Sequence, residues 1–241
     1  MKRGQIKINI ENQNPDDNED LTVLDLLDSL IDNRVDYLEV GSGLCRFPKK
    51  ISKIYKNLNI SCVEINPSLA EIAKNEGYGV INTDFLNNGL PDNNFDVVHC
   101  SHVIEHFRYP DIIHIVDELL RVTKIGGYLV IHSPLMWKGF YDDIDHVRPY
   151  PPEAILNYLY NPQQQVQGRN KITVEKIWYR TMPKQFDMVD RTNFIYCLKL
   201  TRRIVDIFVS YINKINIKLW NSLRWPASKP NGYVMIIKKI A

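Results

Sequence analysis

The stretch that decides the fold is Val35-Asp36-Tyr37-Leu38-Glu39-Val40-Gly41-Ser42-Gly43-Leu44-Cys45, an apolar segment that runs into a glycine turn. Its β-branched and aromatic residues favour a buried strand over residues 35–40. Gly41 and Gly43 permit backbone angles and close approaches that a Cβ atom would block. We therefore expect a small polar or anionic ligand to lie against this turn.

A second apolar segment, residues 58–64, ends in an acidic side chain, Glu64. This acid follows the glycines by about 20 residues, which is the distance found in nucleoside-binding βαβ units. A carboxylate at that strand end can accept both hydrogen bonds from a ribose diol. A glycine pair alone is common in loops, but the strand, the following helix and the acid together predict a nucleoside-containing ligand.

Composition sets the broad class of the protein. A length of 241 residues fits one large domain, and 44% hydrophobic with 24% charged residues is typical of a soluble globular protein. The net charge of +2 argues against nucleic acid as a partner. We find no apolar run long enough for a signal peptide or a transmembrane segment, and therefore expect a cytoplasmic location.

The four cysteines, Cys45, Cys62, Cys100 and Cys197, form no Cys-x-x-Cys pair. Neither a zinc cage nor a disulfide framework is therefore indicated, and reduced thiols are expected.

Predicted strands and helices alternate along the chain. The strands are expected at residues 35–40, 58–64, 79–82, 95–100, 128–133, 172–179 and 232–239, and helices at 21–31, 47–58, 66–74 and 111–122, with another starting at 151. Residues 1–20 are expected to be a mobile, solvated lead-in. This alternation predicts a single α/β domain over residues 1–241, with a Rossmann-like, doubly wound, mostly parallel sheet.

Ligands bind such sheets outside the carboxyl ends of the strands. That rule gathers one set of polar and glycine residues at a single edge, namely Glu39, Gly41, Gly43, Glu64, Asp84, Ser101, His102 and Ser133.

Two later segments depart from this pattern. Residues 134–152 form an aromatic and acidic loop that we expect to contact the substrate, with Trp137, Phe140, Tyr141 and Tyr150 either stacking on a sugar or packing in the core. Residues 194–224 are expected to be a helical insertion. Its apolar residues and the basic residues within 202–224 fit core packing or a homodimer contact, with a lid or a peripheral membrane contact as alternatives.

Taken together, these features resemble the class I S-adenosylmethionine-dependent methyltransferases, in particular the small-molecule and glycan O-methyltransferase group. The resemblance covers residues 35–152. Its motifs stand as Leu38-Glu39-Val40-Gly41-Ser42-Gly43, Val63-Glu64-Ile65-Asn66, Thr83-Asp84-Phe85, Leu90-Pro91-Asp92, His102-Val103-Ile104-Glu105-His106-Phe107 and Leu119-Leu120-Arg121-Val122 up to Gly126-Gly127.

The resemblance implies S-adenosyl-L-methionine as cofactor and an antiparallel last strand. It assigns the glycine turn to the methionine part of the cofactor, Glu64 to the ribose and Asp84 with Phe85 to the adenine. Ser101 and His102 would line the sulfonium side. The full set of implied cofactor contacts is Glu39, Gly41, Ser42, Gly43, Glu64, Ile65, Asp84, Phe85 and Ser101. Cys45 stands where the family usually has a third glycine.

Transfer of a methyl group to an alcohol requires a base near the acceptor. His146, with Asp145 beside it in the sequence, is one candidate, and His102 and His106 are others. Each of these histidines also fits a purely structural role.

The segment from His102 to His106 is similar to a Glu-x-x-Glu-His element that holds a divalent metal in ubiquinone-pathway and small-RNA O-methyltransferases. The implied ligands are His102, Glu105 and His106, with manganese or magnesium as the metal, and His146 or a nearby aspartate completing the shell. In many relatives the Glu-His pair only shapes the pocket, so a site without metal is the alternative.

The sequence therefore predicts methyl transfer to a hydroxyl of a sugar or glycan. A quinol, phenol or other small molecule is the second acceptor class. A catalytically inactive S-adenosylmethionine-binding partner subunit is the alternative of another kind. An oxidoreductase is disfavoured because Cys45 stands where a dinucleotide fingerprint expects glycine.

Overall fold

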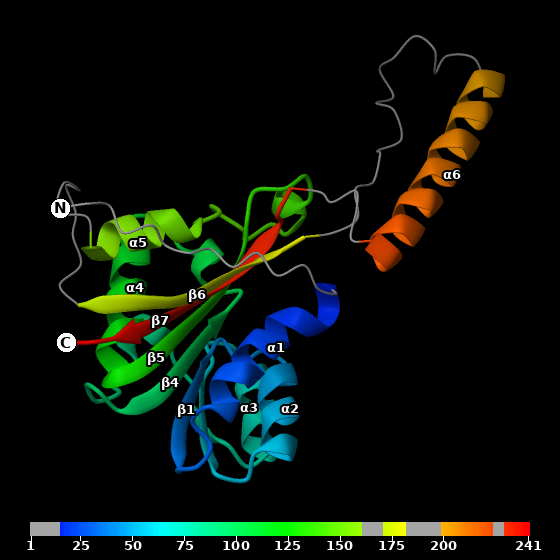
Figure 1. Ribbon diagram of the computed structural model, residues 1–241. Helices are drawn as coiled ribbons and strands as arrows, with labels where there is room; N and C mark the ends of the chain where they lie inside the picture. The colour runs from blue at the N-terminus through cyan, green and yellow to red at the C-terminus, as the bar shows by residue number, and fades with distance from the viewer. Residues whose placement is uncertain (1–14, 161–170, 182–198, 224–228) are drawn as a thin grey trace, which may run out of the picture.

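The fold is organised by one seven-stranded sheet with the strand order β3-β2-β1-β4-β5-β7-β6 (Figure 1). The computed structural model describes residues 15–160, 171–181, 199–223 and 229–241. Strands β1 to β5 pair in parallel, whereas β7 runs antiparallel to both of its neighbours, β5 and β6. The predicted fold class is confirmed, including the antiparallel last strand.

The strands begin and end close to where the sequence pattern placed them. They are β1 (Val35–Val40), β2 (Leu58–Val63), β3 (Gly79–Ile81), β4 (Phe95–Ser101), β5 (Thr123–Pro134), β6 (Ile172–Arg180) and β7 (Gly232–Lys239). Strand β1 lies inside the sheet, between β2 and β4, and all of its residues except Asp36 are buried. Burial on both faces explains why this strand is almost continuously apolar.

Helices cover both faces of the sheet. The covering helices are α1 (Pro15–Asp28), α2 (Arg46–Ile54), α3 (Pro67–Asn75), α4 (Asp111–Val122) and α5 (Pro152–Tyr160). The described chain also contains helix α6 (Lys199–Leu223) and the short 3-10 turns η1 (Phe85–Asn87), η2 (Ile104–His106) and η3 (Phe140–Asp142). Successive residues of β1 point to opposite faces. Leu38 packs with α4 and α5, whereas Tyr37 packs with α1, α2 and α3.

The N-terminal prediction was partly wrong. Helix α1 already begins at Pro15, inside the segment predicted to be a mobile lead-in, and it ends at Asp28 rather than at residue 31. Asp20 is 3% exposed and accepts hydrogen bonds from Arg46 and Lys50 of α2. Two cations therefore compensate the charge that suggested a solvated segment. Residues 1–14 lie outside the described residues.

Strand β5 begins earlier than predicted. Gly126 and Gly127 lie within β5, which starts at Thr123, instead of preceding it. The pairing of β4 with β5 shifts register between Phe95 and Val97, opposite these glycines. A Cβ atom on Gly127 would lie 2.9 Å from the Asp96 carbonyl oxygen, so the glycine is needed where two backbones come close.

The helical insertion before the last strand is present as α6, which Figure 1 shows set apart from the sheet. Residues 194–198 and 224 of the predicted insertion lie outside the described part of the chain. Within that part, no helix combines the length and the hydropathy needed to cross a bilayer.

Candidate active site

The glycine turn after β1 is held against the end of β2. The Gly41 N–H donates to the Val63 carbonyl oxygen at 2.9 Å, and the Gly43 N–H donates to Glu64 Oε2 at 2.8 Å. The other Glu64 oxygen accepts from the Asn66 N–H at 2.9 Å. These bonds fix the carboxylate beside the turn, and each of its oxygens keeps a lone pair for a further donor such as a ribose hydroxyl.

A hollow lies between the turn and the ends of β2, β3 and β4. Its lining residues are Val40, Gly41, Val63, Glu64, Ile65, Thr83, Asp84, Phe85, Val103 and Phe107, around a volume of about 90 Å³. Five of the nine predicted cofactor residues line it: Gly41, Glu64, Ile65, Asp84 and Phe85. Sequence reasoning missed Val103 and Phe107, which flank η2 and carry no polar signal.

Asp84 and Phe85 stand where η1 begins. Asp84 Oδ1 accepts from the Leu86 N–H at 3.1 Å and caps this turn, while the Phe85 ring is 4% exposed. Ile65 is 67% exposed. The exposed aliphatic side chain of Ile65 and the fixed ring of Phe85 both line the hollow, and both are suited to contact a flat ring system.

Glu39 is turned toward the protein interior. Its Oε2 accepts a hydrogen bond from the Tyr37 hydroxyl and lies 2.8 Å from His99 Nδ1. The Glu39 side chain is buried. Ser42 is also buried, at 6% exposed. These two predicted cofactor residues therefore lie beneath the turn and outside the lining of the hollow.

Cys45 has a backbone conformation that favours glycine. Its φ is 56° and its ψ is 34°, which is the left-handed conformation, and it stands immediately before α2. The side chain is fully buried.

Three metal-compatible side chains meet where η2 contacts the substrate loop. The ligand atoms of Glu105, His106 and His146 all lie within 4.8 Å of one another. His106 Nδ1 lies 3.2 Å from the Asp145 carbonyl oxygen, and His146 Nδ1 lies 2.7 Å from the Phe140 carbonyl oxygen. A carbonyl only accepts, so Nδ1 is the donor in both rings, and each neutral imidazole keeps its lone pair on Nε2.

Glu105 is completely buried. Its Oε2 accepts from the Ser133 hydroxyl at 3.2 Å, whereas its Oε1 has no hydrogen-bond partner among the described residues. His102 Nδ1 lies 3.3 Å from that oxygen without forming a hydrogen bond. An incompletely satisfied buried carboxylate fits a role in holding a cation.

The ligand set predicted from sequence has to be corrected in one position. His102 lies outside the group, with its side chain 45% exposed and its φ at 55°, and His146 is the second imidazole instead. His102 nevertheless stays near the group, because its Nδ1 lies 3.3 Å from Glu105 Oε1.

Asp145 lies beside a different histidine from the one predicted. Its carboxylate is 3.4 Å from His106 Nδ1, whereas Asp143 lies 3.9 Å from His146 Nε2. A hydrogen bond with Asp143, and then the charge of His106, lower the pKa of Asp145. Asp145 is exposed, and both its carboxylate and its carbonyl oxygen lie close to His106 Nδ1.

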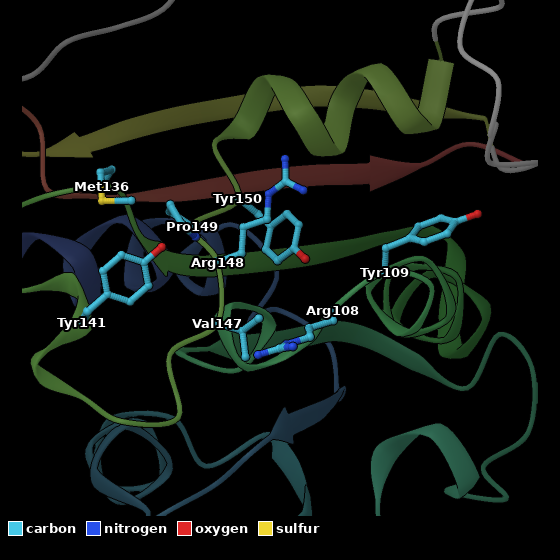
Figure 2. Close-up of a pocket in the computed structure, with 8 residues that line it drawn as sticks. All are labelled: Arg108, Tyr109, Met136, Tyr141, Val147, Arg148, Pro149 and Tyr150. Carbon is cyan, nitrogen blue, oxygen red and sulfur yellow. The ribbon is translucent and has the colours of Figure 1, made fainter.

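A second hollow, with a volume of about 580 Å³, lies beside η2 and the end of the substrate loop (Figure 2). Its lining residues are Arg108, Tyr109, Met136, Tyr141, Val147, Arg148, Pro149 and Tyr150. Of the four aromatic residues predicted either to stack on a sugar or to pack in the core, Tyr141 and Tyr150 line this hollow. Phe140 is fully buried, which agrees with the core-packing alternative.

A family model described as a methyltransferase domain matches residues 38–131. This part of the chain is therefore similar to methyltransferase domains. The match includes the glycine turn, Glu64, Asp84 and η2, and it ends within β5, before the substrate loop. No curated protein sequence matches the chain.

Solved structures share the fold at low identity. A SAM-dependent methyltransferase from Archaeoglobus fulgidus is 22% identical, with a TM-score of 0.56 over 91% of this chain and 94% of the other. Phosphoethanolamine N-methyltransferase 2 from Haemonchus contortus, in complex with S-adenosyl-L-methionine, is 14% identical, with a TM-score of 0.56 over 93% of this chain and 53% of the other. The cyclase SpnF is 14% identical, with a TM-score of 0.56 over 96% and 86%.

The residues around the glycine turn fit S-adenosylmethionine. A Cβ atom on Gly43 would meet nothing within 4 Å, so the space in front of the turn is open, and the Glu64 carboxylate lies at its side. Ile65 and Phe85 supply apolar walls to the hollow. At these identities the solved structures show a shared fold, and by their names they include an N-methyltransferase and a cyclase.

Proposed function

We propose that the protein transfers a methyl group from S-adenosylmethionine to a hydroxyl of a sugar or glycan. The observation that carries this proposal is the position of His146, which stands beside η2 with Nε2 free to accept a proton. Val103, just before η2, and Phe107, just after it, line the cofactor hollow. The base in the substrate loop and the wall of the cofactor hollow thus both lie next to η2.

The bound cofactor supplies a methyl group that is activated by a sulfonium. Glu64 holds the ribose hydroxyls, and the backbone of the Gly41–Gly43 turn lies against the methionine part. The acceptor lies in the hollow lined by Tyr141 and Tyr150, where aromatic rings can stack on a sugar face. His146 Nε2 accepts the hydroxyl proton while the bond from the acceptor oxygen to the methyl carbon forms and the carbon–sulfur bond breaks.

A second proposal concerns a divalent metal, manganese or magnesium, held by Glu105, His106 and His146. Two imidazoles oriented through Nδ1 by backbone carbonyls, next to a buried carboxylate, are the arrangement that metal sites commonly use. A bound metal would lower the pKa of the acceptor hydroxyl. In the first proposal His146 Nε2 accepts a proton, and in the second it binds the metal. One lone pair cannot do both, so the two proposals predict different experimental results.

The separating experiment compares His146→Gln with His106→Gln in methyl transfer from labelled cofactor to a panel of sugars and glycans. If His146 is the base, His146→Gln lowers the rate by about 10²–10⁴-fold, and His106→Gln has a much smaller effect. If a metal is bound, both variants lose activity, chelation abolishes it and manganese or magnesium restores it. Full activity of His146→Gln would contradict both proposals.

Two alternatives from the sequence make different predictions in the same panel. A quinol or phenol that is methylated while every sugar is inert would replace the acceptor class. Tight binding of S-adenosylhomocysteine without transfer to any acceptor would support an inactive cofactor-binding subunit. Thermal unfolding with S-adenosylhomocysteine or NAD tests the cofactor directly. A ligand present at about 100 times its Kd stabilises the fold by about 2.7 kcal/mol, and we expect this only for S-adenosylhomocysteine.

A further inference from the structure

We propose that the acceptor carries a phosphate group and that Arg108 and Arg148 bind it in the hollow beside η2. This inference rests on the proposed methyl transfer and names the acceptor as a phosphorylated sugar. Figure 2 shows both arginines among the residues that line the hollow, with Arg148 extending beside Tyr150 and Arg108 reaching toward Val147.

The charge of the hollow is the first argument. Its lining contains two arginines and no acidic residue. In the described parts of the chain, neither guanidinium forms an ion pair, and Arg148 instead lies 5.7 Å above the Tyr150 ring. Three arginines elsewhere form ion pairs: Arg46 with Asp20, Arg121 with Asp92 and Glu118, and Arg180 with Glu19. The hollow therefore holds two positive charges with no counter-ion in the described structure.

The backbone that carries these arginines is fixed. The N–H groups of Val147 and Arg148 both donate to the Glu105 carbonyl oxygen, at 2.9 and 3.2 Å. The Tyr150 hydroxyl donates to the Phe107 carbonyl oxygen at 2.8 Å, next to Arg108. These bonds tie the two arginine-bearing segments to each other, although they lie far apart in the sequence. A fixed backbone lowers the entropy that binding a ligand between them would cost.

The chemistry of the two side chains selects the ligand. A guanidinium is a planar fork of N–H donors that fits phosphate oxygens in pairs. A phosphate monoester carries about −1.5 to −2 charges at neutral pH, which matches two cations better than the single charge of a carboxylate. The exposed rings of Tyr109 and Tyr141 stand at the same hollow and offer a surface for a sugar. The lining thus matches a sugar phosphate in both of its parts.

The position of the hollow connects the phosphate site to the reaction. Arg108 directly follows Phe107, which lines the cofactor hollow, and Arg148 lies two residues after His146. A phosphate held by the arginines would anchor the acceptor on one side of η2. The sugar hydroxyls could then reach toward His146 Nε2.

The test is calorimetric titration of the full chain with glucose 1-phosphate, glucuronate and glucose, in the absence of cofactor. Wild type is compared with Arg108→Gln/Arg148→Gln and with Arg34→Gln, a matched control at an exposed arginine outside the hollow. All three arginine side chains are exposed, so the substitutions leave the core intact. We expect glucose 1-phosphate to bind wild type and Arg34→Gln about tenfold or more tightly than the double variant.

We also expect glucuronate and glucose to bind wild type more weakly than glucose 1-phosphate does. Equal affinity of wild type and the double variant for glucose 1-phosphate would overturn the proposal. The proposal would also be overturned if Arg34→Gln lost as much affinity for glucose 1-phosphate as the double variant does. Tighter binding of glucuronate than of glucose 1-phosphate by wild type would overturn it too. An RNA oligomer that binds more tightly than the sugar phosphate would assign the arginines to nucleic acid and would also overturn it.

The titration tests the phosphate site independently of the proposed function, because it requires neither cofactor nor turnover. Binding of S-adenosylhomocysteine is measured on the same preparations. If wild type binds the sugar phosphate but no S-adenosylhomocysteine, the methyltransferase proposal fails and the phosphate site stands. If it binds S-adenosylhomocysteine and the arginine variants bind phosphate normally, only the phosphate site fails.

Discussion

Gly41 and Gly43 are required for different physical reasons, although both have positive φ values of 72° and 50°. A Cβ atom on Gly41 would lie 2.5 Å from Val103 Cγ2, whereas a Cβ atom on Gly43 would meet nothing within 4 Å. Gly41 therefore allows η2 to approach the turn. Gly43 provides a backbone angle and leaves room for a ligand.

We predict that Gly41→Ala destabilises the protein more than Gly43→Ala does. A left-handed backbone costs a residue with a Cβ atom about 1–2 kcal/mol, which applies to both variants. Overpacking against Val103 adds about 1–3 kcal/mol in Gly41→Ala alone. Urea unfolding of the two variants and wild type measures the difference, and equal losses would show that η2 moves away without cost.

Single residues also show what sequence could reveal about the site. Gly41, Gly43 and Glu64 were predictable because a strand, a turn and an acid occur at a characteristic spacing. His146 was predicted only as one of several residues that could complete a shell with Glu105 and His106. Which of them lies there depends on how a loop about 40 residues away folds back onto η2. Asp145 was assigned to the adjacent histidine, since sequence neighbours do not reveal which way each side chain turns.

Among the elements, buried strands were the easiest to predict. Strand β7 was placed at Gly232–Lys239, and helix α4 at Asp111–Val122, because apolar residues with regular spacing mark both. Helix α1 was predicted too short because its first turns are acidic. The charge of Asp20 is balanced by cations of α2 that no local pattern contains.

Helix α6 has two unlike faces. Asn216 and Trp220 are buried, whereas Ile204, Ile207, Phe208, Tyr211 and Ile215 are between 41% and 66% exposed. Core packing was one of the two favoured interpretations of this segment, and it does not account for the exposed face within the described structure. Lys214 and Lys218 are exposed on the same helix. A second copy of the helix would bring like charges together, so an anionic lipid surface suits this face better.

We predict that the protein sediments with vesicles containing anionic lipid and that Phe208→Gln/Tyr211→Gln abolishes this. The variant removes two apolar side chains from the exposed face and leaves the buried face untouched. Zwitterionic vesicles serve as the control, and binding to anionic vesicles should weaken as salt screens the lysines. Concentration-dependent dimerisation without vesicle binding would instead support the homodimer contact.

For the whole molecule, a buried histidine links stability to pH. Burial lowers the pKa of His132 well below its usual value of 6.5, and the neighbouring His99, His102, Arg180 and Arg46 lower it further. The imidazole is therefore neutral in the folded state and becomes protonated in the unfolded state once the pH falls below about 6.5. The unfolded state then binds more protons, so stability decreases as the pH decreases.

We predict that wild type loses about 1.4 kcal/mol of unfolding free energy from this residue between pH 7.5 and 5.5, and that His132→Asn does not. Urea unfolding at both pH values measures the two differences, and comparing them removes the contribution of other histidines. Identical pH dependence in both proteins would mean that His132 takes up its proton without unfolding.

The place of β7 in the sheet has a consequence for synthesis on the ribosome. Although β7 is the last strand in sequence, it fills the gap between β5 and β6. Until residues 232–239 leave the ribosome, β5 therefore presents a full edge of unpaired N–H and C=O groups, and β6 has no partner in this sheet. Such an edge can pair with other nascent chains, so binding by chaperones should matter most after β5 has emerged and before residues 232–239 have been made.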